Sequence, residues 1–214
     1  MLFVLAVILF KWILFLIHRP KILGKKENLK LKGGVIFIAN HQNYLDPVML
    51  VVAIPRMIHF MAKKELFEGR VKNAVFRSLL VFPVNRKTAD IKALKQALAL
   101  LEEGKAFGIF PEGRRCVTGE IDDFEKGTAF IAAKCTAPIV PIYISPSSYK
   151  GIRRLVMNVG ETITADEVKQ RLLGRKLVDA LTERMQTDME KLCEETEAML
   201  QQKKTRKEKR TGYA

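Results

Sequence analysis

The chain has 214 residues, of which 48% are hydrophobic and 28% are charged, and its formal net charge is +14. This hydrophobic content excludes an intrinsically disordered protein, and the length predicts one domain with a sizeable core. The positive charge is concentrated in residues 18–32 and 203–210, each of which has six Lys or Arg and one Glu. Flanking basic segments of this kind bind anionic surfaces, which are either membranes or nucleic acids.

The apolar N-terminal stretch decides between these two partners. Residues 2–17 are apolar except for Lys11, and they lack the basic start and the small-residue cleavage site of a secretory signal. As a helix the stretch would be about 25 Å long, which is shorter than the ~30 Å hydrocarbon core of a bilayer. We therefore predict a membrane-associated helix over residues 1–17, followed by a basic juxtamembrane segment over residues 18–32.

This N-terminus predicts a peripheral or monotopic protein on the cytoplasmic face of the cell membrane. The predicted partner is a membrane surface and not a nucleic acid. A single membrane span and a buried core helix are the alternatives for residues 1–17.

Short apolar runs alternate with helical patterns from Gly33 onward, which is typical of an α/β fold. We predict a mixed, mostly parallel sheet flanked by helices, in a domain of residues 33–202 that is followed by a basic tail, residues 203–214. Pro141 predicts an edge position or a bulge for its strand, and Thr164–Glu167 is a capping box that starts a helix. The predicted strands are residues 34–38, 57–61, 81–84, 106–110, 139–143 and 154–159. The predicted helices are residues 48–54, 63–80, 89–103 and 128–136, and a long C-terminal helix with a core stripe of Leu177, Leu181, Met185, Met189 and Leu192.

The three cysteines are far apart in the sequence, and no pair of them has the C-x-x-C spacing. No His lies at metal-ligand spacing from any of them. We interpret Cys116, Cys135 and Cys193 as free thiols in a reducing compartment, and we predict no metal site.

His41 and Asp46 follow the first predicted strand, where open α/β sheets build their sites. A carboxylate that binds one ring nitrogen of a histidine fixes the tautomer and leaves the other nitrogen free to accept a proton. The pair therefore indicates a general base that activates a hydroxyl. The alternative is that Asp46 only caps a helix and that His41 is an ordinary loop residue.

Two other predicted strands end in residues that suit a phosphorylated substrate. Arg86 follows the strand at 81–84, and Glu112, Gly113 and Arg114 follow the strand at 106–110. The carboxyl ends of parallel strands share one edge of a sheet, and the planar guanidinium group binds phosphate with two parallel hydrogen bonds. The chain contains no G-x-x-x-x-G-K-[ST] and no G-x-G-x-x-G motif, so the sequence gives no support for a nucleotide cofactor.

Four blocks of the chain, residues 40–46, 84–86, 110–115 and 137–141, together resemble the ordered blocks of the glycerolipid acyltransferases. The first and third blocks are specific, whereas the second and fourth are loose. Within that family the chain is most similar to the bacterial 1-acylglycerol-3-phosphate acyltransferases.

The resemblance implies transfer of a fatty acyl group from an acyl thioester to the sn-2 hydroxyl of lysophosphatidic acid. The product would be phosphatidic acid, a step of phospholipid biosynthesis. The donor would be acyl carrier protein or acyl-coenzyme A, the acceptor a lysophospholipid, and no cofactor would be needed.

The same resemblance implies roles for particular residues. His41 would be the general base and Asp46 its orienting partner, while Arg86, Glu112 and Gly113 would bind the acceptor's phosphate. Arg114 stands where members of the family commonly have Thr, and we interpret it as a further cation for that phosphate.

Two other interpretations remain open at this point. The acceptor could be glycerol-3-phosphate or another lysolipid on the same fold. Alternatively, the protein could be a non-enzymatic basic membrane-binding protein, in which His41 would be dispensable. The sequence does not distinguish between the two donors.

Overall fold

The computed structural model of the protein describes residues 13, 15, 16, 20–85, 90–116, 118–149, 155–169 and 175–211. Most of the helix predicted over residues 1–17, and the whole of Arg86, lie outside this part of the chain. Among the described residues, no helix combines the length and the apolar character needed to cross a bilayer.

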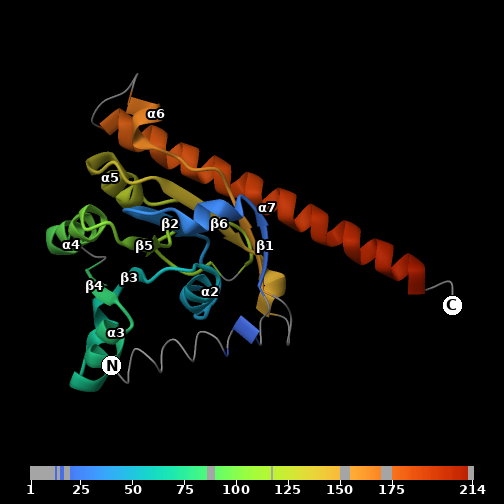
Figure 1. Ribbon diagram of the computed structural model, residues 1–214, viewed down its shortest axis with the longest axis horizontal. Coiled ribbons are helices and arrows are strands. Elements are labelled where there is room, and N and C mark those ends of the chain that lie inside the picture. Colours follow the sequence, from blue (N-terminus) through green and yellow to red (C-terminus); the bar gives the residue numbers. More distant parts are fainter. Residues whose placement is uncertain are drawn as a thin grey trace.

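In the described part of the chain, seven strands form one sheet with the order β1-β7-β6-β2-β5-β3-β4 (Figure 1). Every neighbouring pair is parallel except β6 and β7, which are antiparallel. The predicted mixed, mostly parallel sheet is therefore confirmed. The strands are β1 (Lys21–Gly24), β2 (Val35–Ala39), β3 (Ile58–Lys63), β4 (Val81–Val84), β5 (Ala106–Ile109), β6 (Ile139–Ile144) and β7 (Val156–Val159).

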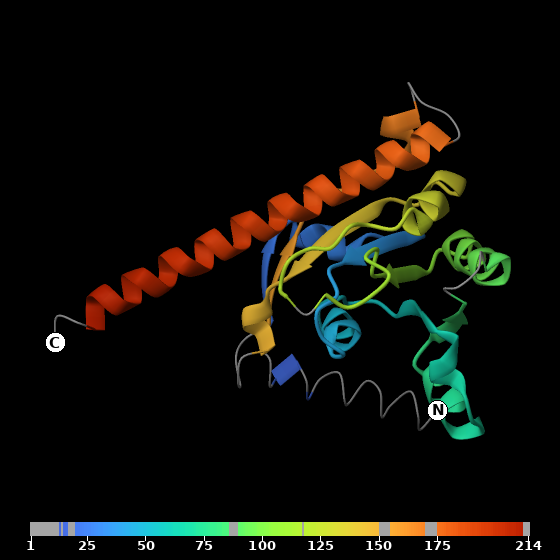
Figure 2. The ribbon, with the colours of Figure 1, turned by 180° about the vertical axis from the view of Figure 1, so that it is seen from behind.

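Helices cover both faces of this sheet (Figures 1 and 2). Helices α4, α5 and α7 pack on one face, where they meet Ile36 and Ile38 of β2. Helix α2 packs on the other face against Val35 and Phe37. Because both faces of β2 are buried, its sequence is apolar throughout rather than alternating. The helices are α2 (Asp46–Ala53), α3 (Arg70–Ser78), α4 (Ile91–Glu102), α5 (Gly127–Lys134), α6 (Ala165–Lys169) and α7 (Arg175–Thr211), and the 3-10 turns are η1 (Lys26–Lys30), η2 (Lys64–Phe67) and η3 (Pro146–Tyr149).

The single helix predicted over residues 63–80 is wrong, because the chain divides there into η2 and α3. Gly69 lies between them with a φ of 89°, a left-handed conformation that glycine adopts without strain. This residue turns the chain, so α3 starts in a new direction and lies at the periphery of the molecule.

Strand β1 was not predicted, because its four residues lie within the basic segment 18–32. It pairs in parallel with β7 at the edge of the sheet. A Cβ atom on Gly24 would lie 2.2 Å from the carbonyl oxygen of Val159, so only glycine permits this close approach. The lysine that begins β1 suits an edge strand, where charge discourages pairing with another chain.

The expected edge position for Pro141 is also wrong, since β6 lies between β7 and β2. Pro141 sits where the pairing with β7 ends, and its carbonyl oxygen accepts a hydrogen bond from the N–H of Gly160 at 2.9 Å. Proline has no N–H to donate in return. The side-chain amide of Asn28 supplies that donor instead, at 2.8 Å from the Gly160 oxygen.

The helix start at Thr164 and the core stripe of the C-terminal helix are confirmed, and one of the two bonds of the predicted capping box is present. The N–H of Glu167 donates to the Thr164 hydroxyl at the start of α6, at 3.4 Å. Helix α7 buries the predicted stripe against the sheet and then continues through most of the predicted basic tail as far as Thr211. Its C-terminal turns project beyond the sheet (Figure 2).

Candidate active site

The candidate site lies at the carboxyl end of β2, between the two strands that flank it. Because β5 and β6 both run parallel to β2, the segments that follow these three strands meet at one edge of the sheet. These segments contain the loop from Asn40 to Leu45, the turn at Pro111, and η3.

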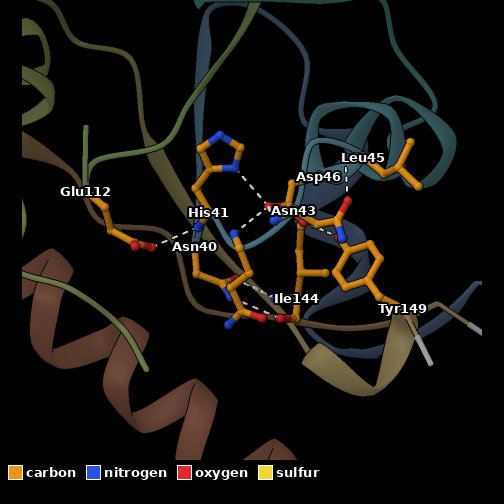
Figure 3. A network of polar contacts seen from close by, with 9 residues as sticks. Asn40, His41, Asn43, Leu45, Asp46, Glu112, Ile144 and Tyr149 are labelled. Carbon is orange, nitrogen blue, oxygen red and sulfur yellow. Dashed lines mark hydrogen bonds and ion pairs between the residues drawn. The ribbon is translucent and has the colours of Figure 1, made fainter. Parts of the chain in front are cut away.

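Asn40 fixes the start of the first loop. Its side-chain amide donates to the carbonyl oxygen of Ile144 at 3.0 Å and accepts from the Ile144 N–H at 2.7 Å (Figure 3). The side chain is buried, and its two bonds continue the β2–β6 pairing by one residue through a side chain instead of the backbone. The residue before His41 is therefore held as firmly as a strand residue.

The predicted pairing of His41 with Asp46 is present. Nδ1 of His41 lies 2.9 Å from Oδ2 of Asp46, which is the first residue of α2 and is almost fully buried. The same oxygen accepts the backbone N–H groups of Gln42 at 2.6 Å and Asn43 at 2.8 Å. The other carboxylate oxygen accepts the Tyr149 hydroxyl (Figure 3). Every one of these partners donates to the carboxylate, so Asp46 is held in one orientation.

The Asp46 carboxylate determines which ring nitrogen of the His41 imidazole carries the hydrogen. In a neutral imidazole whose Nδ1 donates to Asp46, Nε2 carries no hydrogen and can accept a proton. The ring stacks on Phe110, with centroids 4.2 Å apart and an interplanar angle of 22°. The histidine side chain is 16% exposed, so a substrate hydroxyl can reach it. The arrangement is suited to general-base catalysis.

The segment after β5 holds the backbone of His41 from the other side. The N–H of His41 donates to Oε1 of Glu112 at 2.8 Å, and its carbonyl oxygen accepts the N–H of Cys116 at 2.8 Å. Together with Asn40 and Asp46, these bonds fix both the backbone and the ring of the histidine.

Glu112 is buried, which differs from the position expected of a residue that binds phosphate. Its side chain is 3% exposed, and its Oε2 atom has no hydrogen-bond partner among the described residues. Burial, with a smaller contribution from the nearby carboxylates of Asp122 and Asp46, raises the pKa of Glu112 to about 7, and the hydrogen bond from the His41 backbone opposes this rise. Its observed contact is with the His41 backbone, and a carboxylate at this place would repel a phosphate group.

Gly113 shapes the turn that directs Glu112 inward. Its φ is 64°, and its N–H donates to the carbonyl oxygen of Phe110 at 3.1 Å, which closes a four-residue turn with Pro111 in the second position. A Cβ atom here would lie 2.5 Å from the carboxylate of Glu125. The exposed Glu125 side chain could move aside from such an atom, so it is the left-handed backbone conformation that favours glycine here.

The arginines that follow this turn lie at the surface. Arg114 forms an ion pair with Asp122 at 2.6 Å, and its side chain is 75% exposed. Arg115 donates to the hydroxyl of Tyr44 at 2.7 Å and stacks over its ring at 3.4 Å. The structure thus brings His41 together with the Glu112–Arg114 segment. It does not describe Arg86, which follows β4 at the far edge of the sheet.

Two residues of the site were missed from the sequence. Asn40 carries a weak signal, because a polar residue that directly follows a fully buried strand usually has a specific partner. Tyr149 carries none, since it lies 103 residues from Asp46 in the chain. Burial and the adjacent Asp46 carboxylate raise the pKa of Tyr149, so its hydroxyl remains a neutral donor to that carboxylate.

A buried carboxylate and an oriented histidine at the edge of a parallel sheet form an arrangement that is chemically suited to the activation of a hydroxyl group. The family model described as Acyltransferase matches residues 22–145, which is more than half of the chain. The chain therefore belongs to the acyltransferase family, and the resemblance inferred from the four sequence blocks is confirmed.

Among the relatives are two bacterial proteins, each named 1-acyl-sn-glycerol-3-phosphate acyltransferase. The protein of Bacillus subtilis is 33% identical over 172 residues, which cover 78% of this chain and 85% of the relative. The protein of Streptococcus pneumoniae is 31% identical over 175 residues, which cover 79% of this chain but only 64% of the relative.

A solved structure shares the fold. It is the 1-acyl-sn-glycerophosphate (LPA) acyltransferase PlsC of Thermotoga maritima, which is 24% identical with a TM-score of 0.65. The match covers 85% of this chain and 74% of that chain.

Proposed function

We propose that the protein transfers a fatty acyl group from an acyl thioester to the sn-2 hydroxyl of lysophosphatidic acid, which forms phosphatidic acid. The observation that carries this proposal is the His41–Asp46 pair, whose Nε2 is free to take a proton from an acceptor hydroxyl. The names of the two bacterial relatives, 1-acyl-sn-glycerol-3-phosphate acyltransferase, support the choice of acceptor. The reaction is a step of phospholipid biosynthesis.

His41 acts as the general base in this reaction. Its Nε2 removes the proton of the acceptor hydroxyl while the hydroxyl oxygen attacks the thioester carbonyl carbon. The tetrahedral intermediate then collapses, the carbon–sulfur bond breaks, and the imidazolium returns the proton to the leaving thiolate. Asp46 stabilises the imidazolium and keeps the ring oriented in both steps.

The segment after β5 has two roles in the proposal. Glu112 is a positioning residue, because its carboxyl group holds the His41 backbone and not the substrate. Gly113 shapes the turn, and Arg114 contributes a cation for the acceptor's phosphate once it leaves Asp122. Arg86 is the principal phosphate ligand, since a guanidinium matches the geometry of two phosphate oxygens.

The substrates place the enzyme at the cytoplasmic face of the cell membrane, where lysophosphatidic acid lies in the bilayer. Residues 1–17 provide the attachment, and the basic residues of 18–32 and 203–210 add attraction to anionic lipids. The donor, either acyl carrier protein or acyl-coenzyme A, approaches from the aqueous side.

The decisive experiment is an acyl-transfer assay with the purified full chain. Each donor is offered with lysophosphatidic acid, with glycerol-3-phosphate and with an uncharged-headgroup lysolipid, and the His41→Ala variant serves as the control. We expect phosphatidic acid from lysophosphatidic acid with at least one donor, and little product with the variant. Acylation of glycerol-3-phosphate in preference to lysophosphatidic acid would refute the assigned acceptor.

A further inference from the structure

The imidazole ring of His41 is held by a second group besides Asp46. The hydrogen bond at Nδ1 fixes the direction of one nitrogen, but the plane of the ring can still rotate about the axis of that bond. One face of the ring lies on Phe110, with centroids 4.2 Å apart and an interplanar angle of 22°. The two contacts together fix the plane of the ring, and with it the direction in which Nε2 points.

Phe110 is in turn supported by an aromatic ring of the neighbouring strand. Strand β3 lies next to β5 in the sheet (Figure 1), and Phe60 of β3 is only 4% exposed. The rings of Phe60 and Phe110 are nearly parallel, at 11°, and their centroids are 6.2 Å apart, a separation typical of interacting aromatic side chains. Phe60, Phe110 and His41 therefore form an aromatic row that leads from the core to the site.

Gly108 leaves room for the aromatic row. It is paired with Phe60 across the two strands, and it lies two residues before Phe110, so it faces the same side of the sheet. A Cβ atom on Gly108 would lie 2.4 Å from Cε1 of Phe60. The ring of Phe60 thus lies over a residue that has no side chain, and this brings the ring next to Phe110.

A second aromatic pair of the same sheet provides a contrast. Phe107 of β5 stacks on Phe82 of β4, with centroids 5.9 Å apart and an interplanar angle of 23°. Both rings are buried in the core that the sheet forms with α4, α5 and α7. Because successive residues of a strand face opposite sides, Phe107 is directed away from the aromatic row. Loss of the Phe107 ring should therefore affect core packing alone.

The Phe110 ring also acts on the charge that forms during the reaction. When Nε2 takes the proton of the acceptor hydroxyl, the imidazole becomes a cation, and a positive charge over an aromatic face is attracted by the ring. The charge is absent from the ground state, so the attraction lowers the barrier of the chemical step and does not tighten substrate binding. The fixed ring plane acts in the same sense, because Nε2 needs no reorientation before the proton transfer.

We infer that Phe110 is a positioning residue for the general base, and that Phe60, which lies over Gly108, holds Phe110 in place. This role rests on the proposed function of His41, which the His41→Ala variant tests separately. It concerns the orientation of the imidazole and requires no particular acceptor or donor.

The first test compares the kinetics of three variants of the purified full chain. Phe110→Leu removes the ring at the site, Phe110→Tyr keeps it, and Phe107→Leu removes a ring of the same strand on the other face. We expect Phe110→Leu to lower kcat about 3–30-fold, as the attraction of a cation to an aromatic face predicts, and to leave both KM values unchanged. The other two variants should keep a kcat close to that of the wild type. Phe82→Leu replaces Phe107→Leu if the latter does not fold.

A double-mutant cycle tests the support from Phe60. Phe60→Leu should lower kcat less than Phe110→Leu does, because Phe60 acts only through Phe110. The two substitutions together should lower kcat no further than Phe110→Leu alone, since the effects of residues in contact are not additive. A combined effect equal to the product of the two single effects would remove Phe60 from the proposed role.

Nuclear magnetic resonance tests the stacking without a measurement of activity. The chain has three histidines, His18, His41 and His59, and comparison with His41→Ala identifies the resonances of His41. A phenyl ring that faces the imidazole shifts the ring-proton resonances upfield, so Phe110→Leu should move them downfield and Phe107→Leu should not. If Phe110→Leu does not fold, as judged by circular dichroism, Phe110→Met replaces it, because methionine fills the space without an aromatic face.

Four results would overturn the inference. Equal losses of kcat in Phe110→Leu and Phe107→Leu would show that lower stability alone is responsible. A loss in Phe110→Tyr as large as in Phe110→Leu would show that the ring is not needed, and unmoved His41 resonances in Phe110→Leu would show that the rings do not stack. A higher KM for one substrate at unchanged kcat would show that Phe110 binds that substrate. An active His41→Ala variant would refute the proposed function itself, and the inference with it.

Discussion

The two segments that form the candidate site differ in how firmly they are held. In the loop after β2, Asn40, His41 and Asp46 each make at least two hydrogen bonds. In the segment after β5, Glu112 is buried against this loop, but Arg114 extends to the surface with only an exposed ion pair to Asp122. The residues proposed for the chemistry are therefore preorganised, whereas Arg114, proposed to bind the acceptor, is free to change its contact.

Because of this difference, substitutions in the two segments should affect different kinetic constants. Changes in the loop after β2 should lower kcat, because they disturb a geometry that the transition state needs. Changes to the surface arginines should raise the acceptor's KM, because they remove a contact that is equal in the ground and transition states.

The largest effect should follow from His41→Ala. Removal of a general base typically lowers turnover by about 10²–10⁴-fold. The backbone bonds of residue 41 to Glu112 and Cys116 do not involve the imidazole, so the melting temperature should stay close to that of the wild type. Steady-state kinetics and thermal unfolding test this together, and a kcat within a few-fold of wild type would remove His41 from the mechanism.

Asp46→Asn should lower kcat by about 10²-fold or more, because the amide no longer fixes the proton on Nδ1 of His41. Unlike His41→Ala, it should also lower the melting temperature. An amide has only one oxygen to accept the bonds from Gln42, Asn43 and Tyr149. If the variant keeps wild-type stability, the hydrogen bonds to the Asp46 carboxylate do not stabilise the loop.

Arg86→Ala should raise the acceptor's KM and leave kcat nearly unchanged. A charge-assisted hydrogen bond contributes roughly 1.5–3 kcal/mol, which corresponds to about 10–150-fold in binding. Arg86→Lys should recover only part of this loss, because lysine cannot make two parallel bonds to phosphate. The donor's KM is the internal control, and a rise in that constant alone would assign Arg86 to the donor.

Glu112→Gln should change how stability depends on pH. The raised pKa means that the folded protein holds the Glu112 proton more tightly than the unfolded chain does. As the pH rises from about 4.5 to 7, the unfolded chain loses this proton first, so the folded state loses up to about 3 kcal/mol of stability. The glutamine variant cannot ionise and should lack this loss.

Urea unfolding of the wild type and of Glu112→Gln at several pH values measures this effect. The stability difference between the two proteins should shrink or reverse across that window. Parallel pH curves would show that Glu112 does not keep its proton in the folded protein.

Arg114→Thr should have the smallest effect of the five. Exposed ion pairs contribute about 0–1 kcal/mol, so a change below about fivefold is expected in the acceptor's KM. A much larger increase would show that Arg114 moves from Asp122 to the phosphate during binding. It would then count among the principal ligands together with Arg86.

The sequence predicted the parts of the site that are local in the chain. His41 and Asp46 are five residues apart, and one strand end and one helix start suffice to bring them together. The order of strands and helices likewise followed from short apolar runs and caps. The division of residues 63–80 was missed because the chain around Gly69 carries a helical pattern on both sides.

The contacts between distant segments could not be predicted in this way. Asn40 forms hydrogen bonds with Ile144, and Tyr149 forms one with Asp46. The sequence around Asn40 or around Tyr149 does not indicate which distant residue is its partner. The interior position of β6 was missed for the same reason. Asn28, more than a hundred residues before Pro141, supplies the donor that makes a proline tolerable there.

The bonds of Asn40 to the last residue of β6 and of Asp46 to η3 also set when the site can form during synthesis. Asn40 and its partner Ile144 are 104 residues apart, and Asp46 and Tyr149 are 103 residues apart. At about 5–20 residues per second, the ribosome needs roughly 5–20 s to make the second partner after the first. Until then the loop after β2 lacks these two partners, so a nascent chain carries the histidine proposed as its general base well before the proposed site is complete.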